Sequence, residues 1–119
     1  MRIIVDGILP SEWRKDLSLK IKNNEIRTWK FIVEGGYKRL LHTGDEQYND
    51  VVIRLIAPSK EELKNGIKYT HFVPTVLTTI KDKDDKSVAE GHLGIVLGRF
   101  AEILNCHYAK LVKNYQTVL

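Results

Sequence analysis

The amino-acid sequence predicts an α+β fold, in which an antiparallel β-meander packs with a short helix and one long C-terminal helix. Short runs rich in β-branched and aromatic residues, separated by turns that contain glycine or asparagine, predict the meander. Two capping-box motifs, which begin at Ser59 and Ser87, predict the helices. With 119 residues, 43% of them hydrophobic and 29% charged, the chain has the size and composition of a single domain spanning residues 1–119.

The first part of the chain is predicted to be mostly strand. A β-prone run from Arg2 to Val5 is followed by Pro10, which predicts a single helical turn around Trp13. Apolar and polar residues then alternate on both sides of Asn23-Asn24, with the period of two that is typical of half-buried strands. Residues 17–33 are therefore interpreted as a β-hairpin.

Three further strands are expected. Tyr37–His42 follows the turn Glu34-Gly35-Gly36, and Val51–Ile56 is the most strand-like run in the chain, which favours a central place in the sheet. Residues 67–80 also have β character, and Pro74 within them predicts an edge position or a bulge.

Two helices complete the predicted fold. The capping box at Ser59 predicts a helix of one or two turns that ends at Gly66, and residues 81–86 are expected to form an exposed loop. The capping box at Ser87 begins a segment without proline, so a long helix is predicted from residue 87 to residue 116. At about 1.5 Å per residue this helix spans roughly 40 Å, more than a small sheet needs for cover.

The long helix is predicted to display three stripes. A stripe of small residues allows close approach by the sheet of the same chain, by a symmetry mate or by a ligand, because each glycine costs about 1 kcal/mol in a helix and a compensating contact is expected. We take Gly91, Gly94, Gly98 and Ala101 as the candidate oligomer interface. The other stripes are an apolar one facing the core (Leu93, Leu97, Phe100, Leu104, Leu111) and a cationic one (His92, Arg99, Cys106, Lys110, Lys113).

The cationic stripe has two interpretations. Helices commonly expose such residues to solvent, with no further role. Alternatively, dimerisation brings two copies together into a pocket where Arg99 binds a phosphate bidentately and His92 assists. The chain has 19 Lys and Arg against 15 Asp and Glu, a net charge of +4 that favours anionic partners.

Composition also bears on the cellular setting. The chain contains no apolar run long enough to span a membrane and no signal-peptide core, so no membrane partner is expected. Its one cysteine, Cys106, cannot form an internal disulfide, which suits a reducing compartment. The predicted location is the cytoplasm.

No catalytic motif is evident, and the chain is not expected to be an enzyme. Cys106 and His107 point about 100° apart on a helix, and the four histidines lack metal-ligand spacing, so neither a metal nor a cofactor is predicted. His71-Phe72-Val73 and His92-Leu93-Gly94 are similar to the paired His-x-Ser/Thr motifs of 2H phosphoesterases, but both lack the hydroxyl residue. A basic, aromatic-containing segment from Lys20 to Arg39 would suit a nucleic-acid-binding module, although interspersed acidic residues disfavour that partner.

A small sheet followed by a long, glycine-bearing helix with a cationic face resembles the phage anti-Thoeris sponge proteins, which sequester cyclic ADP-ribose-type signals and cyclic oligonucleotides. The resemblance implies an anti-defence protein in the host cytoplasm that binds its nucleotide without cleaving it. It also implies a homodimer, or an assembly of dimers. By this resemblance Phe72 would stack on the base and Arg99 would bind phosphate, helped by Arg54, His92 and Asn105.

A different class of function remains open, a small inhibitor or immunity protein that acts through a protein–protein interface. Such a protein needs neither a pocket nor a motif. Inhibitors of nucleic-acid enzymes tend to be acidic mimics, whereas this chain is basic, and the charge therefore favours a small anionic ligand. The sequence analysis thus predicts a non-catalytic protein that sequesters a phosphorylated small molecule.

Overall fold

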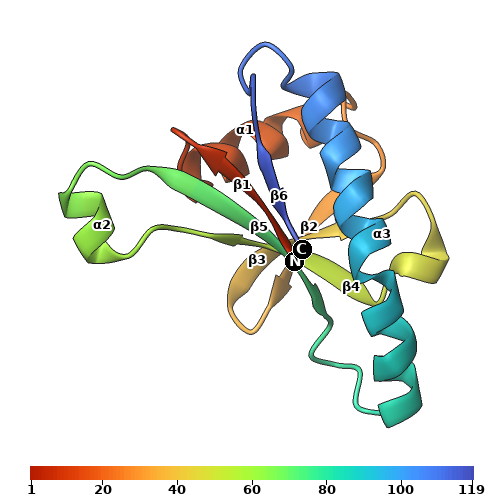
Figure 1. Cartoon of the computed structure of the whole chain (residues 1–119). Coiled ribbons are helices and arrows are strands. Elements are labelled where there is room, and N and C mark those ends of the chain that lie inside the picture. The colour runs from red at the N-terminus through yellow and green to blue at the C-terminus, as the bar shows by residue number, and fades with distance from the viewer.

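The computed structural model describes residues 1–119 as one six-stranded antiparallel sheet with three helices (Figure 1). The strands lie in the order β2-β3-β4-β5-β1-β6. This confirms the predicted α+β class, and β2 to β5 form the predicted meander. The strands are β1 (Arg2–Asp6), β2 (Trp29–Glu34), β3 (Tyr37–His42), β4 (Val51–Ile56), β5 (Tyr69–Val76) and β6 (Gln116–Val118); the helices are α1 (Pro10–Lys22), α2 (Lys60–Lys64) and α3 (Lys83–His107), with a 3-10 turn, η1 (Glu46–Tyr48).

Helix α1 replaces the first strand of the predicted hairpin, so this part of the prediction is wrong. The buried residues of α1 are Pro10, Trp13 and Leu17, which are spaced as one face of a helix, whereas Leu19 is 54% exposed. The Trp13 and Phe72 rings pack nearly perpendicular to each other, with ring centroids 5.2 Å apart. This long-range contact selects the helix over the strand that the local alternation favoured.

The central strands match their predictions closely. Gly35 and Gly36 form the two-residue turn between β2 and β3 with positive φ angles of 57° and 83°, which side chains other than glycine rarely adopt. β4 is the third of six strands. The predicted edge position or bulge at Pro74 is wrong, because β5 lies between β4 and β1 and pairs with β4 in continuous register. The pairing of β5 with β1 ends at Phe72, so the missing amide hydrogen of Pro74 leaves no gap on that side.

The two capping predictions have opposite outcomes. At α2, the Ser59 hydroxyl accepts the Glu62 amide hydrogen at 3.1 Å and the Glu62 carboxylate accepts the Ser59 amide hydrogen at 3.0 Å, as expected. At α3, the Asp82 carboxylate caps the helix by accepting two amide hydrogens, so the helix begins four residues before Ser87 and residues 83–86 are not a loop.

Helix α3 also ends earlier than predicted. It stops at His107, and residues 116–118 form β6, which pairs with β1. The buried Tyr108 ring packs against Trp13 at a centroid distance of 4.8 Å, and the buried Val112 turns the chain back toward the sheet. Lys110, Leu111 and Lys113 therefore do not belong to the stripes of the helix.

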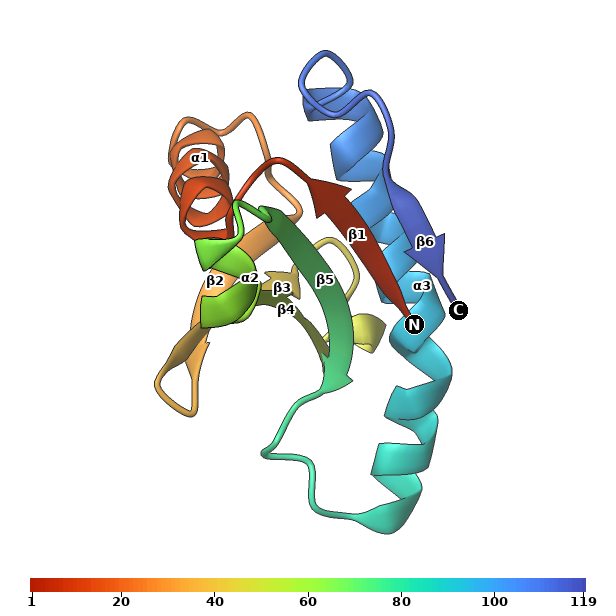
Figure 2. The ribbon, with the colours of Figure 1, turned by 60° about the vertical axis from the view of Figure 1, so that its left-hand side comes forward.

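Helices α1 and α3 cover one face of the sheet and enclose the core. Phe72 of β5 contacts both Trp13 of α1 and Phe100 of α3. Figure 2 shows α3 running beside β1 and β6, with the two chain termini close together. No helix of the structure has the length and apolar character needed to cross a membrane.

The sheet is strongly twisted, and its strands separate between β3 and β4. These strands pair only at Leu40–Ile53 and Leu41–Val52, and the β2–β3 hairpin then diverges from β4 (Figure 1). The hairpin tip instead reaches the segment after β5, where the Glu34 carboxylate accepts the Thr78 amide hydrogen at 3.0 Å. This divergence opens a cleft in the sheet.

Candidate functional site

Phe72, the predicted base-stacking residue, lies in the centre of the core. Its side chain is fully buried, and its ring centroid lies 5.2 Å from that of Trp13 and 4.5 Å from that of Phe100. The ring has no solvent-accessible face. We therefore assign Phe72 to the core and do not retain it as a ligand contact.

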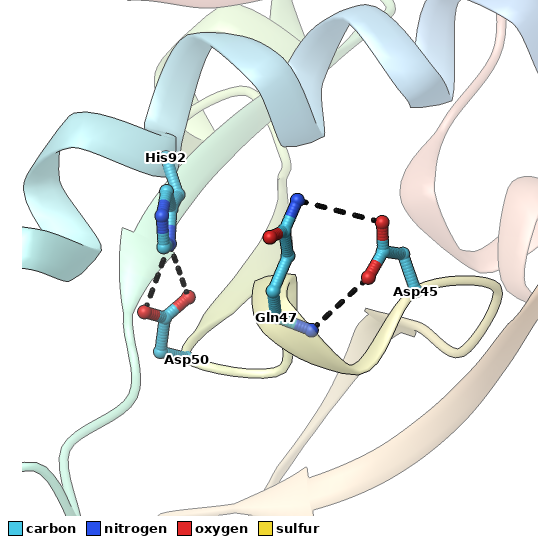
Figure 3. A network of polar contacts seen from close by, with 4 residues as sticks. All are labelled: Asp45, Gln47, Asp50 and His92. Carbon is cyan, nitrogen blue, oxygen red and sulfur yellow. Dashed lines mark hydrogen bonds and ion pairs between the residues drawn. The ribbon is translucent and has the colours of Figure 1, made fainter.

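His92, predicted to assist phosphate binding, joins helix α3 to the loop before β4. Its Nδ1 lies 2.9 Å and 3.1 Å from the two carboxylate oxygens of Asp50 (Figure 3). The Tyr48 ring packs against the imidazole, with ring centroids 5.0 Å apart. In the same loop, the Asp45 carboxylate accepts the Gln47 amide hydrogen at 3.2 Å and caps η1. His92 thus has a structural partner that ties the loop to the helix.

Arg99 lines a small pocket of about 290 Å³ between α3 and the end of β3. His42 forms one wall; it is 6% exposed, and its Nδ1 is buried without a hydrogen-bond partner. Burial, and to a smaller extent the Arg99 guanidinium, lower the pKa of His42. Arg99 lies 3.5 Å from Glu102, and Asp45 also lines the pocket, so two carboxylates oppose one arginine. We call this the His42 pocket; its charge disfavours a phosphate.

The last two predicted ligand residues lie elsewhere. The side-chain oxygen of Asn105 is 3.5 Å from the Tyr115 hydroxyl. Arg54 is exposed on β4 and lines the opening between β3 and β4. The five predicted residues therefore do not form one site, because they occupy the core, the loop contact, the His42 pocket, the end of α3 and the β3–β4 opening.

The β3–β4 opening is the cleft with the strongest charge. It has a volume of about 500 Å³ and receives cations from three elements, α1, β3 and β4. We call it the cationic cleft. Four of its eight lining residues are basic and none is acidic: Arg14 of α1, Lys38 and Arg39 of β3 and Arg54 of β4, together with Gly36, Tyr37, Leu55 and Ile56.

Arg39 is the most enclosed cation of the cleft. Its side chain is 15% exposed, and its Nε lies 3.2 Å from a carboxylate oxygen of the buried Glu34. That N–H has no aligned acceptor, so the contact is an ion pair and not a directed hydrogen bond. The guanidinium also lies over the Tyr37 ring, 5.6 Å from its centroid. Glu34 and Tyr37 therefore hold Arg39 in place.

The other three cations have no such partner. Arg14, Lys38 and Arg54 take part in no ion pair and no side-chain hydrogen bond within the chain. Beside them, the Tyr37 ring is 68% exposed at the rim of the cleft. The arrangement combines free positive charge with an accessible aromatic surface.

Sequence reasoning identified Arg54 but missed Arg14 as a site residue. The sequence pattern places Lys38, Arg39 and Tyr37 only in the candidate nucleic-acid-binding segment. Arg14 belongs to no candidate set, because the sequence predicts only a single helical turn around Trp13 and a strand from residue 17. A helical period through Pro10, Trp13 and Leu17 is the signal that places Arg14 at the border of the buried face of a helix, where its side chain is half-buried.

The two histidines of the 2H-phosphoesterase comparison lie apart. His71 on β5 stacks on Tyr69 and has its Nδ1 3.2 Å from an Arg2 nitrogen, whereas His92 pairs with Asp50. They line no common pocket, so a paired-histidine site is not formed. The structure also has no group of three His, Cys, Asp or Glu side chains placed to hold a metal ion.

The stripe of small residues on α3 is largely open. A Cβ atom at Gly91 or Gly98 would meet no atom within 4 Å, and one at Gly94 would lie 3.4 Å from the Met1 side chain. Close packing against the sheet of the same chain is therefore not what the stripe provides. Gly94, Gly98 and Ala101 instead line an apolar groove of about 140 Å³ beside β1 and β6.

Comparison with protein-family models, with curated proteins and with solved structures finds no match for this chain. The charge and shape of the cationic cleft therefore carry the functional conclusion.

Proposed function

We propose that this protein binds a phosphorylated small molecule in the cationic cleft and does not transform it. The observation that carries this proposal is the gathering of Arg14, Lys38, Arg39 and Arg54 around one cleft with no acidic residue in its lining. Like charges held close together repel one another, and a bound anion relieves that repulsion. Guanidinium groups also match phosphate geometry, because they donate two parallel hydrogen bonds.

The rest of the lining supports binding without turnover. The cleft contains no histidine, cysteine or carboxylate that would serve as a nucleophile or a general base. The exposed Tyr37 ring offers a stacking surface for an aromatic base, the role first expected of Phe72. A nucleotide fits this combination, and the cyclic nucleotide signals that the anti-Thoeris sponges sequester belong to the same chemical class.

We extend the proposal to self-association through α3. Gly91, Gly94, Gly98 and Ala101 present a stripe of small residues in which Gly91 and Gly98 are open, Gly94 lies near Met1 and Ala101 is partly buried. A second copy of α3 packed there would gain the close approach that offsets the cost of glycine in a helix. We expect Gly98→Leu to convert the assembly to monomer in size-exclusion chromatography with light scattering. An assembly of unchanged mass in this variant would remove the stripe as the interface.

Native mass spectrometry with a panel of linear and cyclic nucleotides tests the proposed function. We expect the folded protein to gain the intact mass of one nucleotide per chain, with no altered product released. Arg54→Ala should weaken the binding by about ten-fold, the value of one charge-assisted hydrogen bond. Lys113→Ala is the matched control, because it removes one exposed cation outside the cleft. Equal loss in both variants, or release of a modified nucleotide, would contradict the proposal.

A further inference from the structure

We infer that the ligand of the cationic cleft carries at least two linked phosphate groups. This inference rests on the proposed function and specifies its ligand class. It depends on how much charge in the cleft lacks a counter-ion, and on where that charge lies.

Three of the four cations of the cleft lack a counter-ion within the chain. Arg39 already has a counter-ion in Glu34, whose carboxylate is 8% exposed and lies 3.2 Å from the guanidinium. Arg14, Lys38 and Arg54 have none, so three positive charges remain uncompensated. One terminal phosphate group supplies about 1.5 to 2 negative charges at pH 7, and it would leave about one cation without a partner. Two linked phosphates bring the charge close to balance.

The placement of the cations leads to the same ligand. Arg14 projects from α1, Lys38 from β3 and Arg54 from β4, so the charges stand on separate walls of the cleft. The strands that carry Lys38 and Arg54 diverge after the Leu40–Ile53 pair. A volume of about 500 Å³ is much larger than one phosphate group, which contacts only part of such a lining. A chain of linked phosphates reaches several walls at once.

Arg39 gives this extended ligand a fixed point. Its guanidinium is held by Glu34 on one side and lies over the Tyr37 ring, so little conformational freedom is lost when a phosphate binds it. The Glu34 carboxylate is itself held by the Thr78 amide hydrogen. Arg14, Lys38 and Arg54 lack such restraint and can adjust to a second phosphate.

Isothermal titration calorimetry with inorganic phosphate, pyrophosphate and a short oligothymidylate tests the inference. We expect pyrophosphate to bind at least about ten-fold more tightly than phosphate, because it gains at least one further charge-assisted contact. Arg14→Ala, Lys38→Ala and Arg54→Ala should each weaken pyrophosphate binding by about ten-fold. Phosphate reaches only part of the lining, so at least one of these variants should leave its affinity unchanged. Lys113→Ala should change neither titration.

The outcomes separate this inference from the proposed function. Equal affinity for phosphate and pyrophosphate, or loss of phosphate binding in all three variants, would overturn the two-phosphate inference and leave an anion-binding cleft. No binding of phosphate, pyrophosphate or nucleotide would overturn the proposed function itself. Oligothymidylate binding more tightly than pyrophosphate would overturn both in favour of a nucleic-acid site.

Far-UV circular dichroism establishes that each variant is folded. Lys38 is an exposed residue of the hairpin, so Lys38→Ala keeps the test available if Arg14→Ala does not fold.

Discussion

The cationic cleft and the His42 pocket both contain arginine, yet their electrostatics differ. Four cations and no acid line the cleft, whereas Arg99 in the pocket is opposed by Asp45 and Glu102. Arg39 of the cleft pairs with the buried Glu34, which does not line the cleft, while the Arg99–Glu102 pair is largely exposed. An arginine opposed by two carboxylates is electrostatically less suited to bind an anion than several cations without counter-ions.

Charge reversal gives the largest expected difference between the two regions. Arg54→Glu should weaken pyrophosphate binding by about 100-fold or more, because it removes one attraction and adds one repulsion. Arg99→Glu should change it by less than about two-fold, since screening limits the effect of an exposed charge outside the cleft. Calorimetric titration of both variants measures this. A larger loss for Arg99→Glu would transfer the anion site to α3.

Removing the buried Glu34–Arg39 ion pair should give the second-largest effect, on the free energy of unfolding. Glu34→Gln should lower the free energy of unfolding by about 2 kcal/mol, because Arg39 loses its counter-ion while the glutamine oxygen can still accept the Thr78 amide hydrogen. Urea denaturation followed by circular dichroism gives the value. Unchanged stability would show that Arg39 does not depend on Glu34, and the fixed position assigned to its guanidinium would have to be abandoned.

The buried His42 should make the stability of the protein depend on pH. Because the pKa of His42 is lowered in the folded protein, the unfolded chain binds the proton more readily, and stability falls as the pH drops below 6.5. His71, whose pKa is lowered by burial and by Arg2, contributes in the same direction. His42→Gln should therefore make the loss of stability at acid pH smaller without abolishing it. Urea denaturation at a series of pH values measures the slope, with His107→Gln as the control at the exposed end of α3.

The exposed ion pair of the pocket should have the smallest effect. Glu102→Gln removes the partner of Arg99 at 3.5 Å, but solvent screens both side chains, so the free energy of unfolding should change by less than about 0.5 kcal/mol. The same urea experiment compares it with Glu34→Gln. A loss as large as that of Glu34→Gln would contradict the distinction between an enclosed and an exposed pair.

Elements governed by neighbouring residues could be predicted from the sequence. β3 and β4 match their predicted bounds, since Gly35-Gly36 specifies the turn before β3 and Val51–Ile56 is uniformly β-prone. The Ser59 capping box acts over only three residues and is present as expected. In each case the determining interactions lie within a few positions along the chain.

The helical state of α1, the early end of α3 and the cationic cleft were decided by contacts between residues distant in the sequence. Trp13 meets Phe72 and Tyr108 across the core, and these contacts set the helical state of α1 and the early end of α3 against the local pattern. The cleft joins α1, β3 and β4, and the separation of two strands forms it. By itself the sequence determined the α+β class, the central strands and the excess of positive charge. Only the tertiary structure decided which cations share a site, because helix packing and sheet twist set the distances between them.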